Sequence, residues 1–187
     1  MYFISPGPAN TKTVMEIAVG EAVKRGIPAI VAASNTGQTI DALLEAARGA
    51  GYTGSLVCVS HVNGFVKNGE NEMDGAVRRR LEEAGVRVCT AAHTLSGTER
   101  GISRKFQGAY PVEIIAHTLR MLGQGTKVCV EIAAMALDGG FIGYGKPVIG
   151  IGGSGQGADT ALILSPGYSH SIFETRIHEI LCKPNLL

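Results

Sequence analysis

The sequence predicts an α/β fold, a three-layer sandwich in which helices cover both faces of a mostly parallel sheet. Short, continuously apolar segments alternate with longer segments whose apolar residues recur every three or four positions. This alternation is typical of parallel strands joined by helical crossovers. In addition, 26 of the 187 residues are glycine, about twice the usual share, and many stand where a helix or strand should end. Residues 1–187 are expected to form a single domain.

The N-terminal segment is expected to form a strand, a helix and a second strand. Residues 2–5 are a short apolar strand that ends at a Pro-Gly-Pro turn, because proline lacks the N–H that would continue it. Thr13 and Glu16 form a capping box, after which apolar residues recur at helical spacing until Gly26. Residues 27–33 are continuously apolar, as expected of a strand covered on both faces.

The same alternation continues through the middle of the chain. Apolar residues at helical spacing predict helices at residues 40–47 and 73–84. Continuous apolar runs predict strands at residues 55–60 and 86–91. The three arginines at 78–80 could bind phosphate, but two glutamates follow four residues later. Ion pairs on a solvated helix face are therefore the favoured interpretation.

The C-terminal half combines further helices with short strands. A second capping box, from Ser96 to Glu99, predicts a short polar helix, and Tyr110-Pro111 should open another that ends at Gly123. Residues 127–137 fit either a strand or a helix, but their length and their alanines favour an almost wholly buried helix. The remaining expected strands lie at residues 148–151, 160–164 and 177–182.

Composition excludes several classes of partner. The chain carries 17 Lys and Arg against 16 Asp and Glu, and 5% of its residues are aromatic with no Trp. Neither a basic surface nor stacking platforms for bases are expected, so nucleic acid is not an expected partner. The N-terminus lacks a signal-peptide pattern and no run of eighteen apolar residues occurs, so we expect a cytoplasmic protein with no membrane partner.

The four cysteines are expected to be inert. They stand far apart and match no CxxC or zinc-finger spacing, and aliphatic residues flank each of them. We therefore expect buried, reduced thiols and no metal site. The cysteines are Cys58, Cys89, Cys129 and Cys182.

Polar residues gather in loops that follow predicted strands, where ligands bind in parallel α/β sheets. The first of these loops leads into a helix N-terminus, which carries about half a positive charge. It is therefore either a cradle for an anion or only a cap and a turn. Its candidate binding residues are Ser34, Asn35, Thr36, Gly37 and Thr39.

A second candidate loop is rich in glycine. Such density permits close backbone approach to a ligand, and its amides could form an anion-binding nest. The spacing GxGxxG occurs from Gly150 to Gly155, but a strand rather than a helix is expected to follow, so a dinucleotide-binding turn is disfavoured. The candidate residues here are Gly152, Gly153, Gly155, Gly157 and Asp159.

Three further polar residues have two possible roles. His61 and His93 each follow a predicted strand, where an imidazole can exchange protons with a ligand or simply stabilise a loop by hydrogen bonds. Glu131 is the charged residue of an apolar segment, so it should be paired, protonated or close to a polar cavity. We expect it to be structural, for example by holding a Lys or Arg from a loop.

Several segments resemble a known family. Residues 32–39 resemble the phosphate-binding segment of the pyruvate kinase C-terminal domain, and residues 152–164 are similar to its late glycine loop and following strand. Most of the chain is similar to small, mainly archaeal, stand-alone proteins described as pyruvate kinase alpha/beta domain-like. The similarity runs through VAASNTG, HVNGFVKNGENEM, HTLSGTERGISRKFQG, KVCVEIAAMALDGG and GGSGQGADTALIL.

This resemblance implies a three-layer α/β fold and a phosphate-bearing ligand, FMN, held between the two loops. Ser34, Thr36, Gly37 and Thr39 would cradle the phosphate, and residues 152–159 would close over it. His61, Gly64 and His93 would lie nearer the ring or the sugar. The physiological activity of such proteins is unassigned, and a homo-oligomer is possible.

Two functions remain open at this point. The first is a binding protein for a phosphorylated small molecule, above all FMN. The second is an enzyme, either a flavin-dependent oxidoreductase or an acid/base catalyst that uses His61 or His93, with Arg100, Arg104 and Lys105 gripping an anionic substrate. We expect no pyruvate kinase activity, because the barrel that carries such chemistry needs about 250 residues.

Overall fold

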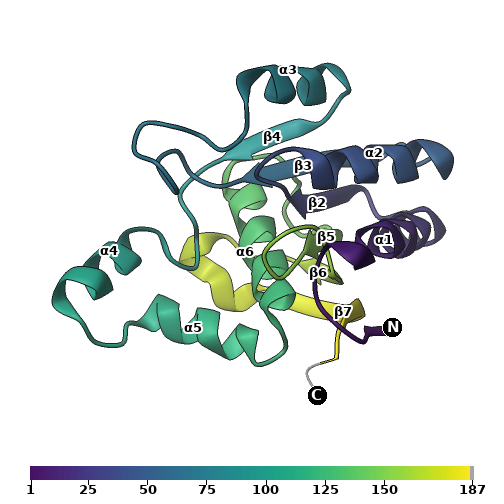
Figure 1. The fold of residues 1–187 in the computed structure, drawn as a ribbon. Helices are drawn as coiled ribbons and strands as arrows, with labels where there is room; N and C mark the ends of the chain where they lie inside the picture. The colour runs from purple at the N-terminus through teal and green to yellow at the C-terminus, as the bar shows by residue number, and fades with distance from the viewer. Residues whose placement is uncertain (186–187) are drawn as a thin grey trace.

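A computed structural model describes residues 1–185 and confirms the α/β class (Figure 1). The strands are β1 (Tyr2–Phe3), β2 (Ala29–Ala33), β3 (Ser55–Ser60), β4 (Arg87–Thr90), β5 (Val148–Gly152), β6 (Thr160–Ser165) and β7 (Arg176–Pro184). The helices are α1 (Thr11–Arg25), α2 (Gln38–Gly49), α3 (Gly75–Glu83), α4 (Gly97–Phe106), α5 (Pro111–Arg120) and α6 (Gln124–Asp138), with 3-10 turns η1 (Pro8–Asn10) and η2 (Ser169–Glu174).

The strands form one seven-stranded sheet in the order β1-β7-β6-β5-β2-β3-β4. Strand β2 pairs in parallel with β3 and β5, β3 with β4, and β1 with β7. Strand β6 pairs antiparallel with both β5 and β7. These pairings run six strands in one direction and reverse β6, so the expectation of a mostly parallel sheet is confirmed.

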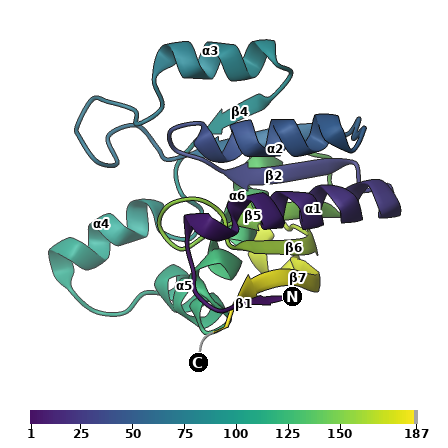
Figure 2. The ribbon, with the colours of Figure 1, turned by 45° about the vertical axis from the view of Figure 1, so that its right-hand side comes forward.

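Two apolar cores lie on the two faces of the sheet. In β2, Ile30 and Ala32 face one core while Ala29 and Val31 face the other, because successive side chains of a strand point to opposite faces. The first core is completed by α1, α2 and α3, and the second by α6 and α5. Figure 2 shows α1 and α2 side by side along one face.

Helix α6 is the central helix of the second core. It spans Gln124–Asp138, and most of its residues are buried, which confirms the helical interpretation of residues 127–137. The β5–β6 hairpin likewise confirms the strands expected on either side of the glycine loop. Within residues 1–185, no helix has the length and apolar character needed to cross a bilayer.

Both predicted capping boxes are wrong in their hydrogen bonds. Helix α1 begins at Thr11, ahead of the predicted start, because the turn η1 leads directly into it. Thr13 therefore lies inside the helix and not at its N-cap. At the start of the helix, Thr11 Oγ1 accepts a hydrogen bond from Ala158 N at 3.0 Å. Ser96 does stand at the N-cap of α4, but its side chain caps no N–H of that helix. Glu99 Oε2 accepts from the Glu113 N–H at the start of α5, at 2.9 Å.

Two of the three arginines of α3 make ion pairs, and one of these pairs is the expected one. Arg78 Nε donates to Glu82 Oε1 at 3.0 Å. Arg80 makes the other ion pair with Asp41 of α2, through two hydrogen bonds of 2.6 and 3.0 Å. The Arg78 pair lies within α3, whereas the Arg80 pair joins α3 to α2.

All four cysteines are buried as free thiols. Burial raises the pKa of Cys58 to about 12 and that of Cys182 to about 11. It also raises the pKa of Cys89 and Cys129. Because the thiolate is the reactive form, the structure supports the expectation of inert thiols.

Candidate functional site

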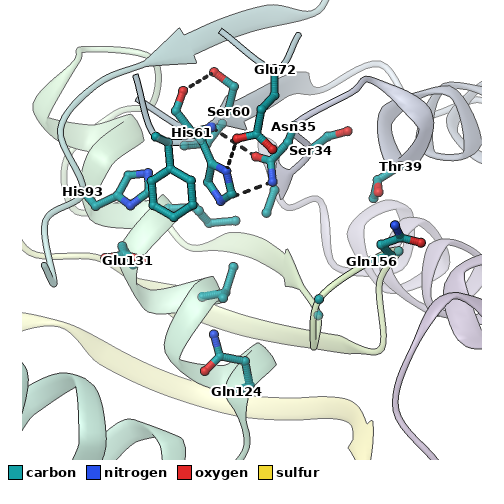
Figure 3. Close-up of a pocket in the computed structure, with 18 of the residues that line it drawn as sticks. Ser34, Asn35, Thr39, Ser60, His61, Glu72, His93, Gln124, Glu131 and Gln156 are labelled. Atoms are coloured by element: carbon teal, nitrogen blue, oxygen red, sulfur yellow. Dashed lines mark hydrogen bonds and ion pairs between the residues drawn. The ribbon is translucent and has the colours of Figure 1, made fainter. Parts of the chain in front are cut away.

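A cavity of about 740 Å³ opens where the carboxyl ends of β2, β3, β4 and β5 meet. Parallel strands bring these ends to one edge of the sheet, which is where α/β proteins bind ligands. The loops after the strands form part of its wall, and the first turns of α6 form another part (Figure 3). Its volume lies within the roughly 300–1,000 Å³ of small-molecule sites.

The cavity brings together nine of the candidate residues. Those that line it are Ser34, Asn35, Thr36, Thr39, His61, His93, Gly153, Gly155 and Gly157. The lining does not include Gly37, Gly64, Gly152 or Asp159. In residues 1–185, no cluster of three His, Cys, Asp or Glu side chains is placed to hold a metal ion.

The β2 loop combines a turn with an open helix start. Ser34 is buried, and its Oγ accepts a hydrogen bond from Gly37 N at 3.1 Å, so this hydroxyl shapes the turn. Gly37 is the N-cap of α2, and no side chain of residues 1–185 caps that helix. The first N–H groups of α2 are therefore left for water or a ligand. Figure 3 shows the Thr39 side chain facing Gln156 of the glycine loop.

Most of the space around the late glycines is filled by the protein itself. A Cβ atom at Gly152 would lie 2.8 Å from Gly125 O in α6, and one at Gly157 would lie 2.6 Å from Pro8 Cα. The glycines there allow close packing against α6 and η1 rather than close approach of a ligand. At Gly155 nothing lies within 4 Å of the added atom, so this residue leaves space in the loop for a ligand.

The Asp159 side chain fixes the glycine loop through its hydrogen bonds. It is fully buried, and its Oδ2 accepts hydrogen bonds from Gly7 N and Ser154 N, both at 3.1 Å. Its Oδ1 accepts from Thr160 Oγ1 at 2.8 Å. Asp159 therefore holds the loop against the N-terminal segment, and its contacts are with protein groups.

His61 links three parts of the site. Its Nδ1 lies 2.5 Å from Glu72 Oε2, and its Nε2 lies 3.2 Å from Asn35 Nδ2 (Figure 3). Its ring centroid lies 3.9 Å from that of Phe65, with the two ring planes tilted by 33°. The sequence indicated His61 and Asn35 but not Glu72, which lies eleven residues further along the chain and returns through a loop.

His93 is held as a neutral imidazole. Its Nε2 accepts a hydrogen bond from Val62 N at 3.4 Å, and its ring centroid lies 5.3 Å from that of His61. Burial lowers the pKa of His93, and the charge on Glu131 opposes that effect. Burial and the Val62 N–H, which needs an acceptor on the ring, thus both favour the uncharged form of His93.

A cationic wall faces these loops. Lys127 and Glu131 form a buried ion pair within α6, and Glu131 Oε1 accepts from Leu95 N at 2.9 Å. The expected loop partner of Glu131 is therefore wrong, because the cation stands one turn earlier on the same helix. Burial lowers the pKa of Lys127.

Two arginines complete this wall. Arg100 of α4 lines the cavity as the sequence suggested, whereas Arg104 and Lys105 stand outside the lining. Arg120 was not indicated by any motif. It reaches the cavity because its Nε donates to Gln124 Oε1 at the start of α6, at 2.7 Å.

The comparisons with known proteins found a matching family model and similar solved structures. A family model described as pyruvate kinase, alpha/beta domain, matches residues 12–164. A crystal structure of a pyruvate kinase from Cryptosporidium parvum is similar with 15% sequence identity and a TM-score of 0.39, over 75% of this chain and 20% of that one. The chain thus spans about a fifth of the length of that enzyme. On the family match, the chain belongs to the pyruvate kinase alpha/beta domain family.

Proposed function

We propose that the chain binds a phosphorylated small molecule in this cavity, with FMN as the candidate ligand. The observation that carries the proposal is the convergence of three helix starts. Residues of the first turn or the N-cap of α2, α4 and α6 line the cavity, and within residues 1–185 no side chain caps any of the three. Free N–H groups and positive helix ends favour a multiply charged anion.

The two ends of the cavity suit the two ends of FMN. Thr36, Thr39 and Gly155 would hold the phosphate, since they offer hydroxyls, a helix start and open space. The apolar wall near α6, formed by Val128, Ile132 and other residues, would hold the ring. Bound FMN would supply one- or two-electron transfer.

The test is a titration of the purified protein with FMN, followed through flavin fluorescence. Saturable binding at one site, displaced by inorganic phosphate, is expected. The Thr53→Ala variant is a matched control, because Thr53 is an exposed threonine beside the opposite ends of the strands. Absence of saturable binding for FMN and for other phosphorylated small molecules would overturn the proposal.

The contact between His61 and Glu72 favours a second candidate, acid/base catalysis. A carboxylate beside an imidazole orients the ring and stabilises its charged form, as in many general bases. If this candidate holds, His61→Gln should retain the ligand and lose turnover. Retention of both binding and turnover in His61→Gln and His93→Gln would remove the two histidines from any catalytic role.

A further inference from the structure

The hydrogen bonds around Asn35 and His61 fix the position of one proton. The backbone N–H of His61 donates to Asn35 Oδ1 at 3.1 Å. A backbone N–H can only donate, so the amide oxygen rather than the amide nitrogen must face it. This orientation turns Asn35 Nδ2 towards His61 Nε2, 3.2 Å away.

The amide nitrogen can only donate as well, so His61 Nε2 must accept. The ring of neutral His61 therefore carries its proton on Nδ1, where it donates to Glu72 Oε2 at 2.5 Å. Asn35 uses one of its two amide N–H groups on His61. Because Asn35 lines the cavity beside Thr36, the other N–H is available to a ligand.

We propose that Asn35 binds the ligand and that His61 and Glu72 are positioning residues, which hold its amide while His61 is neutral and release it when His61 is protonated. We call the three residues the latch. The proposal rests on the proposed function and adds to it a pH-dependent control of the same site.

Protonation opposes both orientations of the Asn35 amide. An imidazolium has an N–H on Nε2 that would face the amide N–H group directly. Rotating the amide by half a turn satisfies Nε2 but places the amide nitrogen against the His61 backbone N–H. Neither orientation satisfies both groups, so protonation breaks at least one of the two hydrogen bonds that hold the Asn35 amide.

The surrounding groups allow this change at His61 rather than at its neighbour. Glu72 faces Nδ1 and would pair with the imidazolium. The His93 ring lies on another side, and burial lowers the pKa of His93, which favours its neutral form. Phe65 contributes an uncharged ring to the same cluster. Lys127, Glu131 and Arg100 act on His93 through their charges.

The loop that carries Glu72 is well anchored. Asn71 Nδ2 donates to His61 O at 3.3 Å and to Asn63 Oδ1 at 2.8 Å. Met73 N donates to Asn71 Oδ1 at 2.8 Å, and the Met73 side chain is buried in the first core. Glu72 is thus held on the return of its loop, facing the imidazole.

The first experiment needs no ligand. NMR of the ¹⁵N-labelled protein follows the ring nitrogens of His61 and the side-chain amide of Asn35 between pH 8 and pH 5. We expect the proton on Nδ1 at pH 8, and Asn35 resonances that move together with His61 protonation. In His61→Gln the Asn35 resonances should not change over this range. A proton on Nε2 at pH 8, or Asn35 resonances indifferent to His61 protonation, would overturn the latch.

The second experiment measures FMN dissociation constants at pH 7.5 and pH 5.5. Protonation of the FMN phosphate affects all variants alike. We therefore compare the loss of FMN affinity between pH 7.5 and pH 5.5 in wild type with the same loss in His61→Gln. We expect a loss roughly tenfold larger in wild type, and Asn35→Ala roughly tenfold weaker than wild type at pH 7.5.

Glu72→Gln should change the pH response. Glu70→Gln should not, because Glu70 pairs with Lys67 at the surface of the same loop. Equal acid-induced losses in wild type and His61→Gln, or full affinity in Asn35→Ala, would overturn the latch while leaving the binding site intact. A wild type that binds no FMN at either pH would instead overturn the proposed function.

Discussion

Lys127 and Glu131 stand one turn apart in α6 and form an ion pair whose side chains are 6% and 8% exposed. The pair lines the cavity, and its carboxylate also holds the Leu95 N–H. Burial disfavours the charge on Lys127, so the pair depends on each partner to offset the cost of burying the other.

Removing one partner of this pair should be more damaging than removing both. Lys127→Met should lower the free energy of unfolding by about 3 to 5 kcal/mol, because it leaves a buried carboxylate without its cation. Lys127→Met combined with Glu131→Leu should recover much of that loss. Urea denaturation measures each value. A double variant as unstable as the sum of the two single variants would contradict the argument.

Gly37 should matter for the stability of the fold rather than for direct contact with a ligand. Its φ is +92°, and a Cβ there would lie 2.6 Å from Val77 Cγ1 in α3. A side chain at Gly37 thus meets α3, although the resemblance placed Gly37 in the phosphate cradle. Gly37→Ala should lower the free energy of unfolding by about 1 to 3 kcal/mol.

Gly20→Ala is the matched control for this variant. Gly20 lies within α1 and has nothing within 4 Å of an added Cβ, so the change should stabilise the protein by about 0.5 to 1 kcal/mol. Urea denaturation that gives Gly37→Ala the same stability as wild type would show that the turn tolerates a side chain.

His93 should make the folded state less stable in acid. Its pKa is lowered from 6.5 by burial, so the unfolded chain takes up this proton first as the pH falls. The free energy of unfolding should therefore decrease below about pH 6.5, because the unfolded state then binds more protons. His93→Gln removes this contribution.

The measurement is urea denaturation of wild type and His93→Gln at pH 7.5 and pH 5. Wild type should lose more stability than the variant over this range. His117→Gln is the control, since His117 is exposed on α5 and should respond as wild type does. An identical acid loss in wild type and His93→Gln would show that His93 takes up its proton equally in both states.

The four cysteines should resist a thiol reagent until the protein unfolds. Each is buried, and burial raises the pKa of each thiol. Labelling should therefore be slow in buffer and complete in denaturant. Fast labelling of Cys58 or Cys89 in the folded protein would indicate an opening at the strand ends and would favour a redox role.

The sequence predicted the fold well because its signals are local. Continuous apolar runs marked β2 and β3, and the length of the segment at 127–137 favoured a helix where periodicity alone was ambiguous. The first capping box failed because α1 begins at Thr11, so Thr13 lies inside the helix rather than at its start. The second failed because Glu99 accepts its hydrogen bond from the Glu113 N–H of the next helix.

The candidate site was predicted best in the loops that follow strands. His61 stands directly after β3 and Asn35 two residues after β2, which is a local signal. Glu72 and Arg120 reach the cavity through the return of a loop and the end of a helix, which no local pattern reveals. Lys127 did have such a signal, since it stands four residues before Glu131 in an apolar helix.

The central claim is that the β2 loop holds a phosphate, and its most direct test compares FMN with riboflavin, which lacks the phosphate. Thr36 and Thr39 both line the cavity. Hydrogen bonds to a charged group contribute roughly 1.5 to 3 kcal/mol each. Thr36→Ala with Thr39→Ala should therefore weaken FMN binding by about one to three orders of magnitude.

The measurement is the dissociation constant of each ligand for wild type, the double variant and the Thr53→Ala control. We expect riboflavin to bind wild type weakly and to be much less affected by the double change, while Thr53→Ala should match wild type for both ligands. Equal affinities of FMN and riboflavin for wild type, or equal losses for both ligands in the double variant, would show that the β2 loop does not hold the phosphate.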